Sequence, residues 1–414
     1  MEQVKAQISE AKAASRLLAN VGTDAKNRAL RSMADALENN VETILAENAR
    51  DIEAGKAREL SATLLDRLTL TPERIGNMAN GLRDVAGLPD PVGEVLSGSK
   101  RPNGLEIQRV RVPLGVIAVI YESRPNVTVD AAGLCLKAGN ATILRGGSEA
   151  IHSNMILARL MRTAGEANGL PIGSLQFIET TEREAALILM RAEGEIDLLI
   201  PRGGDRLKKS IMENATVPVL TSLGGNCHVY IDKSADVEMA LAIAYNAKAS
   251  RPSVCNAMET LLVHDKAACK ILLRFGDLLR EGGIEVRGCE RTMEFIAEAQ
   301  MATETDWETE FLAPIIAVRI VNSLDEAIAH ISRYGTGHSE AIVTQDYAAS
   351  QRFVNEIDAA CVYVNASTRF TDGAEFGMGA EVGISTQKLH ARGPVGLAEL
   401  TTYKTIVRGN GQIR

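Results

Sequence analysis

The sequence has few cysteines, no long hydrophobic run and no basic stripe. The six cysteines include no CxxC pair, and their spacing matches neither a zinc site nor a disulfide framework, so we expect reduced thiols. No apolar stretch reaches the roughly 18 residues that a membrane span needs. The first 22 residues mix charges and lack the apolar core of a signal peptide. These absences predict a cytoplasmic protein.

The charge and histidine patterns narrow the class of partner further. Basic and acidic residues are interleaved, with 45 Lys and Arg against 53 Asp and Glu and a net charge of −8, so we expect no nucleic-acid-binding surface. None of the six histidines is spaced as a metal ligand from another, which predicts that there is no metal site. A hydrophobic content of 45% over 414 residues is enough for two to three globular domains.

The N-terminal region and the segment after it have different patterns. Apolar residues recur at helical spacing through the first 95 residues, which predicts a helical region that ends at the Gly/Pro-rich break over 87–91. Residues 93–112 contain the turn signal Pro102-Asn103-Gly104 between mixed polar stretches, which is typical of a β-hairpin. Because an isolated hairpin buries little surface, we expect it on a domain surface or against another subunit.

Two series of apolar runs alternate with helical segments. This alternation, with strands apolar on both faces, predicts parallel sheets covered by helices on both sides. The first series contains strands expected at 115–121, 141–145, 175–179, 196–200 and 217–221. The second contains strands expected at 228–232, 259–264, 314–320, 340–345 and 360–365. We therefore predict two α/β domains, with one more strand near the C-terminus.

Turns that follow first-series strands carry residues suited to ligand binding. Asn126, in the Glu-Ser-Arg-Pro-Asn segment after the first strand, offers an amide donor for a crevice or is simply a turn residue. Arg145 precedes two glycines and Ser148, which can cap the next helix, and a second Arg-Gly-Gly turn contains Gly203 and Gly204. Glycines admit a ligand close to the backbone, and helix N-termini and arginines favour phosphate. Two such turns indicate a nucleotide, although tight turns with surface arginines give the same pattern.

Two further segments lie at or beyond the boundary between the two series. The Gly224-Gly225 pair in the Ser-Leu-Gly-Gly-Asn segment suits either an interdomain hinge or close approach to a flat ring. Cys255, in the segment Arg-Pro-Ser-Val-Cys-Asn, lies outside any regular apolar pattern and four residues after Arg251. An accessible thiol in electropositive surroundings is reactive, and the alternative is a small buried cysteine.

Taken in order, these segments resemble the aldehyde dehydrogenase superfamily. The resemblance covers nearly the whole chain and is carried by residues 112–150, 221–232, 250–264, 310–318 and 334–346. Within the superfamily, the Arg-Pro-Ser-Val-Cys-Asn and Glu-Ser-Arg-Pro-Asn-Val-Thr segments are similar to the branch that reduces L-glutamyl 5-phosphate in proline biosynthesis. The resemblance implies an α/β fold with a Rossmann-type cofactor domain, an α/β catalytic domain and a small bridging β-arm.

The resemblance also implies domain boundaries and partners. It places an NADPH-binding domain at 1–92 and 113–225, a catalytic domain at 226–392, and a bridging arm at 93–112 and 393–414. The arm implies a homodimer or a higher homo-oligomer. The reaction implies a functional association with glutamate 5-kinase.

Individual residues acquire roles from the same resemblance. Cys255 is the expected nucleophile. Asn126 is the expected side-chain donor to the oxyanion, which assumes a short insertion, because the family spacing from Gly139-Asn140 falls nearer Glu122. Arg145 stands where the superfamily has a cofactor-binding lysine, which makes it a partner for the 2′-phosphate of NADPH. The implied cofactor-binding residues are Arg145, Ser148, Glu149, Gly203, Gly204, Gly224 and Glu310.

One departure from the superfamily concerns water. Oxidising aldehyde dehydrogenases carry a glutamate base where this sequence has Ser222, so the implied enzyme protects its thioacyl intermediate from hydrolysis. The implied reaction is NADPH-dependent reduction of L-glutamyl 5-phosphate to the 5-semialdehyde with release of phosphate. Arg251 and Arg369 are candidates for holding the substrate's phosphate and α-carboxylate, and His228 is a candidate general acid. The alternatives are a coenzyme-A-acylating aldehyde dehydrogenase and a catalytically silent nucleotide-binding scaffold.

Overall fold

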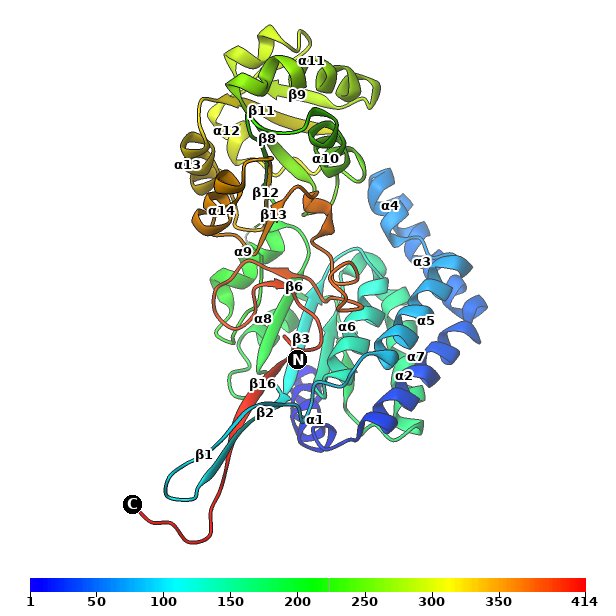
Figure 1. Cartoon of the computed structure of the whole chain (residues 1–414). Coiled ribbons are helices and arrows are strands. Elements are labelled where there is room, and N and C mark those ends of the chain that lie inside the picture. The colour runs from blue at the N-terminus through cyan, green and yellow to red at the C-terminus, as the bar shows by residue number, and fades with distance from the viewer. Residues whose placement is uncertain (223) are drawn as a thin grey trace. The chain divides into compact units, whose positions relative to one another are not determined.

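A computed structural model describes residues 1–222 and 224–414 and divides into two compact units, whose elements are labelled in Figure 1. The first unit comprises Met1–Thr221, Gly377–Gly383 and Val395–Arg414. The second unit comprises Ser222–Phe376 and Ile384–Pro394. Within the described residues we find no helix with the length and apolar character that a membrane crossing requires.

The first unit is built on a four-stranded parallel sheet. Its order is β5 (Leu175–Phe177), β4 (Ala141–Arg145), β3 (Val116–Tyr121) and β6 (Leu198–Arg202). Every residue of the central strand β3 is buried, as a strand covered on both faces requires. The helices that connect and follow these strands are α6 (Asn126–Lys137), α7 (Ile151–Ala167), α8 (Arg183–Met190) and α9 (Asp205–Asn214), with the 3₁₀ turn η1 (Ser148–Ala150) before α7.

The strand expected at 217–221 does not form. Val219 forms only an isolated parallel bridge with Leu199. The Pro218 carbonyl accepts from the Leu199 N–H at 2.9 Å, and the Leu220 N–H donates to the Leu199 carbonyl at 2.9 Å. Because Pro218 has no N–H to donate, no continuous ladder develops. A proline inside an apolar run therefore limits the segment to a single bridge with β6.

The helical N-terminal region predicted from the sequence is confirmed. Helix α1 packs with α8 against the sheet, whereas α2, α3 and α5 form an outer layer over α6 and α7 (Figure 1). Helix α5 begins with Pro72 at its first turn, and the Thr71 hydroxyl accepts a hydrogen bond from the Arg74 N–H at 3.1 Å. The five helices are α1 (Glu2–Leu18), α2 (Thr23–Glu38), α3 (Val41–Ala57), α4 (Ala62–Leu68) and α5 (Pro72–Gly87).

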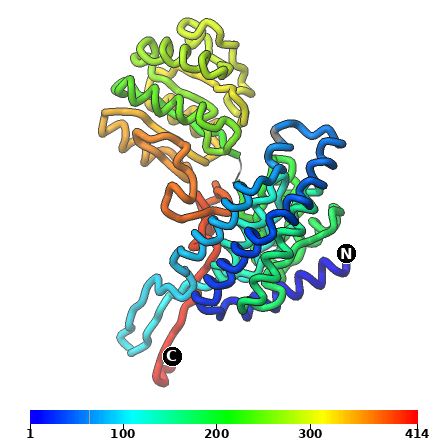
Figure 2. Tube along the Cα trace, turned by 90° about the vertical axis from the view of Figure 1, so that its right-hand side faces the viewer, coloured from blue at the N-terminus to red at the C-terminus, as the bar shows by residue number. Residues whose placement is uncertain are grey.

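A separate antiparallel sheet completes the first unit. The predicted hairpin is confirmed as β1 (Val95–Lys100) and β2 (Glu106–Pro113), and the predicted C-terminal strand is β16 (Thr401–Arg408). Strand β16 pairs with β2 along its whole length, so the order is β1-β2-β16. Figures 1 and 2 show these strands extending away from the helices of the same unit. Little of this sheet is covered, because every residue of β1 is exposed.

The second unit contains a seven-stranded parallel sheet. Its order is β10 (Gln300–Met301), β9 (Glu285–Gly288), β11 (Ile315–Val321), β8 (Met258–His264), β7 (Cys227–Ile231), β12 (Ser339–Val343) and β13 (Cys361–Val364). All five second-series strands predicted from apolar runs are present. Strands β9 and β10 were not expected from the sequence, because they are short and not apolar throughout. The remaining elements are α10 (Val237–Ala249), α11 (Asp265–Glu281), η2 (Glu290–Glu294), α12 (Glu304–Glu308), α13 (Leu324–Tyr334), α14 (Tyr347–Glu356), η3 (Thr368–Phe370), β14 (Ile384–Ser385) and β15 (Gly393–Pro394).

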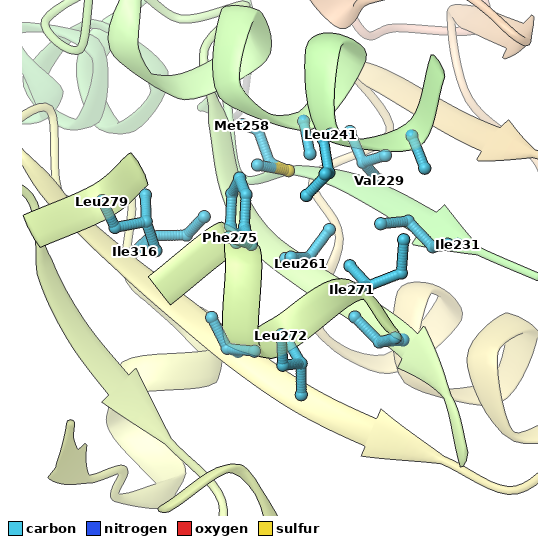
Figure 3. Close-up of a cluster of buried hydrophobic side chains, with 14 of the residues drawn as sticks. Val229, Ile231, Leu241, Met258, Leu261, Ile271, Leu272, Phe275, Leu279 and Ile316 are labelled. Atoms are coloured by element: carbon cyan, nitrogen blue, oxygen red, sulfur yellow. The ribbon is translucent and has the colours of Figure 1, made fainter. Parts of the chain in front are cut away.

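The core of the second unit lies between α10, α11 and the sheet. Figure 3 shows Leu241 of α10 and Phe275 of α11 meeting Leu261 and Met258 of β8 and Ile316 of β11. Each such side chain contributes about 1.5–3 kcal/mol when it leaves water completely. The turn that carries Cys255 therefore joins two well-anchored elements, α10 and β8.

Candidate active site

Cys255 lies in the turn between α10 and β8, with its backbone pressed against a glycine. The residue is half-buried. A Cβ atom on Gly225 would lie 2.0 Å from the Cys255 carbonyl oxygen, so only glycine fits there. The same oxygen accepts a hydrogen bond from the Cys227 thiol at 3.2 Å. The start of β7 thus fixes the backbone of the candidate nucleophile.

The residue after the nucleophile ties the turn to the loop at 367–371. The buried Asn256 amide donates to the carbonyls of Thr371 at 2.9 Å and Arg369 at 3.3 Å. The Thr368 hydroxyl donates to the Asn256 carbonyl at 2.8 Å. These three bonds hold the candidate nucleophile and Arg369 in one local framework, and the sequence patterns had not singled out Asn256.

The two arginines predicted to hold the substrate, Arg251 and Arg369, belong to the same unit as Cys255. The guanidinium of Arg369 donates to the Ser250 hydroxyl at 3.1 Å and also to the Asn256 side chain. Burial lowers the pKa of Arg369, the exposed Arg251 lowers it further, and Cys255 opposes this shift by favouring the charged form. Arg369 is therefore within electrostatic reach of both Arg251 and Cys255.

Burial separates Cys255 from the three structural thiols. Cys135, Cys227 and Cys361 are buried, and burial raises the pKa of Cys135 to about 12. Burial also raises the pKa of Cys227 well above its ordinary value, with the carboxylate of Glu340 adding to the shift. Such thiols stay protonated and inert. The other cysteines with solvent access are Cys269 on α11 and Cys289 after β9.

Gly224 and Glu310, predicted to serve one ligand, are adjacent. Gly224 has φ of +132°, and a Cβ atom there would lie 3.4 Å from Glu310 Oε2. The Gly224 N–H donates to the Ser222 hydroxyl at 3.2 Å. Leu223, which belongs to the same sequence motif, lies outside the described residues. A glycine with this conformation leaves room for a ligand to approach the Glu310 carboxylate.

A buried ion pair lies near Glu310 and was not found from the sequence. Lys248 Nζ of α10 and Glu259 Oε2 of β8 are 2.5 Å apart, and neither side chain is exposed. Burial lowers the pKa of Lys248, and the carboxylates of Glu259 and Glu310 oppose this shift. Nothing in a single helical pattern distinguishes this lysine from a solvated one, because its partner belongs to another element.

In the first unit, the predicted phosphate-binding turns meet at the carboxyl end of the sheet. Glu122, after β3, accepts a hydrogen bond from the Gly204 N–H at 3.0 Å. Glu149, after β4, accepts bonds from the Ser123 N–H at 2.6 Å and hydroxyl at 2.9 Å, and Ser123 has φ of +49°. Carboxylates therefore link the turns after β4, β3 and β6, where open α/β sheets bind their ligands.

Arg145 has an unused donor in this cluster. Its NH2 group donates to the Thr181 carbonyl at 3.2 Å, but its buried Nε has no hydrogen-bond partner among the described residues. Burial lowers the pKa of Arg145, and the carboxylates of Glu149 and Glu122 oppose the shift. A buried guanidinium N–H without a protein acceptor is costly and is suited to an anionic ligand.

Ser148 does not cap helix α7, contrary to the sequence interpretation. The Asp51 carboxylate of α3 accepts from the N–H groups of His152 at 3.2 Å and Ser153 at 2.8 Å. Asp51 is buried, so it serves as the cap from a neighbouring helix. Ser148 is exposed and remains accessible to a ligand.

The side chains of Asn126 and His228, the expected oxyanion donor and candidate general acid, each contact a carboxylate. Asn126 begins α6 in the first unit, and its exposed side-chain amide donates to Asp130 Oδ2 at 2.9 Å. His228 is completely buried in β7, with Nδ1 2.9 Å from Glu340 Oε2. The buried imidazole has no exposed atom with which to protonate a substrate, so it is a poor candidate for the general acid. In the described part of the chain, no group of three or more metal-ligating side chains is assembled.

Comparisons with known proteins agree with the geometry. The model of the aldehyde dehydrogenase family matches residues 1–285 and 296–406. The chain is similar to a gamma-glutamyl phosphate reductase of Moorella thermoacetica, 60% identical over 412 residues that cover 100% of this chain and 99% of that protein. A gamma-glutamyl phosphate reductase of Carboxydothermus hydrogenoformans is 59% identical over 414 residues, covering 100% of both chains.

A solved structure supports the same assignment. The crystal structure of a gamma-glutamyl phosphate reductase from Thermotoga maritima matches this fold with a TM-score of 0.97 and 49% identity, covering 99% of each chain. The α/β fold expected from the sequence is thereby confirmed. The chain belongs to the aldehyde dehydrogenase family and, within it, to the gamma-glutamyl phosphate reductases.

Proposed function

We propose that this chain reduces L-glutamyl 5-phosphate to L-glutamate 5-semialdehyde and releases phosphate, with NADPH as the hydride donor and Cys255 as the nucleophile. This is the second step of proline biosynthesis from glutamate. The observation that carries the proposal is a half-buried Cys255 whose turn is hydrogen-bonded to the loop of Arg369, in a chain that matches gamma-glutamyl phosphate reductases along its full length.

The residues proposed to bind the cofactor suit a phosphate-bearing nucleotide. Arg145 has a buried donor with no protein acceptor, and it is the proposed partner of the 2′-phosphate of NADPH. Glu310 and the adjacent Gly224, which has no side chain, suit the ribose and ring of the nicotinamide. The full set proposed to hold the cofactor is Arg145, Ser148, Glu149, Gly203, Gly204, Gly224 and Glu310.

We assign cofactor binding, the nucleophile and subunit association to three separate parts of the chain. Residues 1–92 and 113–225 bind NADPH, residues 226–392 carry the nucleophile, and residues 93–112 and 393–414 form a bridging arm. The arm supports association into a homodimer or a higher homo-oligomer. A cytoplasmic location and a functional association with glutamate 5-kinase complete the proposal.

Chemistry begins at Cys255. Its thiolate attacks the acyl carbon, the bond between that carbon and the phosphate oxygen breaks, and phosphate leaves with the electron pair toward Arg251. Arg369 holds the α-carboxylate. The Cys255 N–H and the Asn126 amide stabilise the tetrahedral oxyanion, and each good donor contributes about 3–4 kcal/mol.

The resulting thioester on Cys255 must be reduced before water reaches it. Bound NADPH supplies the hydride that this step requires. Ser222 provides no carboxylate base, so hydrolysis lacks the roughly 10²–10⁴-fold acceleration that such a base gives. Breaking of the carbon–sulfur bond then frees the semialdehyde and restores the Cys255 thiolate.

The test uses Cys255→Ala, with Cys289→Ala as a matched half-buried control. We expect Cys255→Ala to lose phosphate-dependent reduction of NADP⁺ by the semialdehyde by at least about 10³-fold, because the covalent route is removed. Cys289→Ala should retain it. Undiminished activity of Cys255→Ala would overturn the proposal.

Two rival functions predict other results. A coenzyme-A-acylating aldehyde dehydrogenase would reduce NADP⁺ only when coenzyme A replaces phosphate in the same assay. A silent nucleotide-binding scaffold would show no reaction with either acceptor, and iodoacetamide at neutral pH would label Cys255 no faster than the exposed Cys269.

A further inference from the structure

Burying the Lys248–Glu259 pair costs folding free energy. Both side chains are completely buried, and their charged atoms are 2.5 Å apart. Removing two charges from water costs several kcal/mol each, and replacing such a pair with apolar residues is often neutral or stabilising. Stability alone is therefore a weak reason for an ion pair between α10 and β8.

The second oxygen of Glu259 holds a strained turn. Glu259 Oε2 faces Lys248, while Oε1 accepts a hydrogen bond from the Leu312 N–H at 3.1 Å. Leu312 has φ of +51°, a left-handed conformation that branched, bulky side chains rarely adopt. Leu312 is itself exposed, so side-chain packing does not impose this conformation. The buried carboxylate of Glu259 holds the Leu312 backbone in this conformation through that hydrogen bond.

This turn carries the candidate cofactor carboxylate. Glu310 precedes Leu312 by two residues, and its Oε2 would lie 3.4 Å from a Cβ atom on Gly224. Burial raises the pKa of Glu259 to about 7, the Lys248 ammonium lowers it, and Glu310 raises it. The three charged groups therefore interact, with Lys248 as the cation that offsets two neighbouring carboxylates.

We propose that Glu259 is a positioning residue for Glu310: Glu259 fixes the turn at Leu312, the turn presents Glu310 to the ribose of the nicotinamide nucleotide, and Lys248 balances the buried charge of Glu259. This inference rests on the proposed function, which assigns Glu310 to the cofactor. Neither Lys248 nor Glu259 touches the reacting atoms in this scheme.

Two double variants that differ in one acceptor test the proposal. Lys248→Met with Glu259→Gln removes both charges but keeps an oxygen for the Leu312 N–H. Lys248→Met with Glu259→Leu removes that oxygen as well. The measurements are the NADPH dissociation constant of the full-length protein, by fluorescence titration, and the melting temperature without cofactor.

We expect the Gln variant to bind NADPH within about threefold of wild type. The Leu variant should bind about tenfold more weakly, which corresponds to about 1.4 kcal/mol. Glu310→Gln should match the Leu variant, and adding Glu310→Gln to the Leu variant should cause no further loss, because both changes act through the same carboxylate. Lys26→Met with Asp90→Leu, which removes another buried ion pair at 2.6 Å, should leave NADPH affinity unchanged.

The outcomes distinguish failure of the positioning role from failure of the proposed function. Equal NADPH affinity of the Gln and Leu variants, or additive losses with Glu310→Gln, would overturn the positioning role while the function stands. Wild-type affinity in Glu310→Gln would overturn the cofactor assignment itself. If Glu259→Leu lowers the melting temperature by more than about 10 °C, the same measurements are made with Glu259→Met in its place. The flexible methionine side chain fills irregular space in a core better than leucine does.

Discussion

At the scale of single residues, the environment of Arg145 bears on the proposed cofactor site. Arg145 is partly buried between the carboxylates of Glu149 and Glu122, and its Nε has no acceptor among the described residues. Burying such a donor costs about 1–3 kcal/mol unless a ligand pairs with it. The arrangement is better explained by a bound anion than by stability.

We predict a cofactor-selective effect of Arg145→Ala. Loss of a charge-assisted contact with the 2′-phosphate should weaken NADPH binding by about 10- to 100-fold and leave NADH binding nearly unchanged. Arg162→Ala on α7 is the control and should alter neither. Fluorescence titration with both nucleotides measures the effect, and an equal loss for NADPH and NADH would refute the 2′-phosphate role.

The types and order of residues in the sequence indicated the candidate site, but they did not indicate the residues that hold it in place. Cys255, Arg145 and Glu310 stand out because their segments carry a nucleophile, a glycine turn and a family motif. Lys248 and Glu259 do not, because a buried charge has the same sequence signature as a solvated one until its partner is known. A carboxylate that links neighbouring turns, such as Glu122 at Gly204, is hidden for the same reason.

At the scale of elements, the turn between α10 and β8 depends on the start of β7. Gly225 lies so close to the Cys255 carbonyl that any Cβ would displace it. The Cys227 thiol donates to the same carbonyl, so the contact is specified by two residues of one segment. The Cys255 backbone is thus held by the segment that begins β7 in addition to the hydrogen bonds of Asn256.

Gly225→Ala should therefore damage catalysis as well as stability. A shift of about 1 Å at a reacting group costs about 10²-fold in rate, so we expect a loss of that order in semialdehyde oxidation. The melting temperature should also fall. Gly76→Ala in α5, where a Cβ meets nothing within 4 Å, should keep full activity and should not lower the melting temperature. Normal kinetics in Gly225→Ala would show that the Cys255 backbone is not tightly held.

Elements with clear apolar runs were predictable, and those without were not. Strand β3 is buried throughout and was found directly, whereas β9 and β10 are short and carry polar residues. The segment at 217–221 has the composition of a strand, but Pro218 interrupts its ladder. Composition thus identifies a strand only when the backbone donors are also free to pair.

At the scale of the whole molecule, the chain returns to its first unit near the C-terminus. Strand β16 pairs with β2, and residues 377–383 also belong to the first unit. The sequence predicted two α/β domains and a terminal strand, but local patterns contain no information on pairing between such distant segments. Only the family resemblance connected residues 393–414 with the hairpin.

The β1-β2-β16 sheet leads to a prediction about assembly. Both outer strands have an unpaired edge within the described chain, and Val95, Leu96, Tyr403 and Val407 expose apolar surface on it. Natural proteins rarely leave long strand edges uncovered, so we expect this sheet to be buried against a second copy. Light scattering at micromolar concentration should give a multiple of 44.4 kDa. Val407→Glu should shift that mass toward the monomer, whereas Val354→Glu, at an exposed position of α14, should not. A wild-type monomer would contradict the bridging role of this sheet.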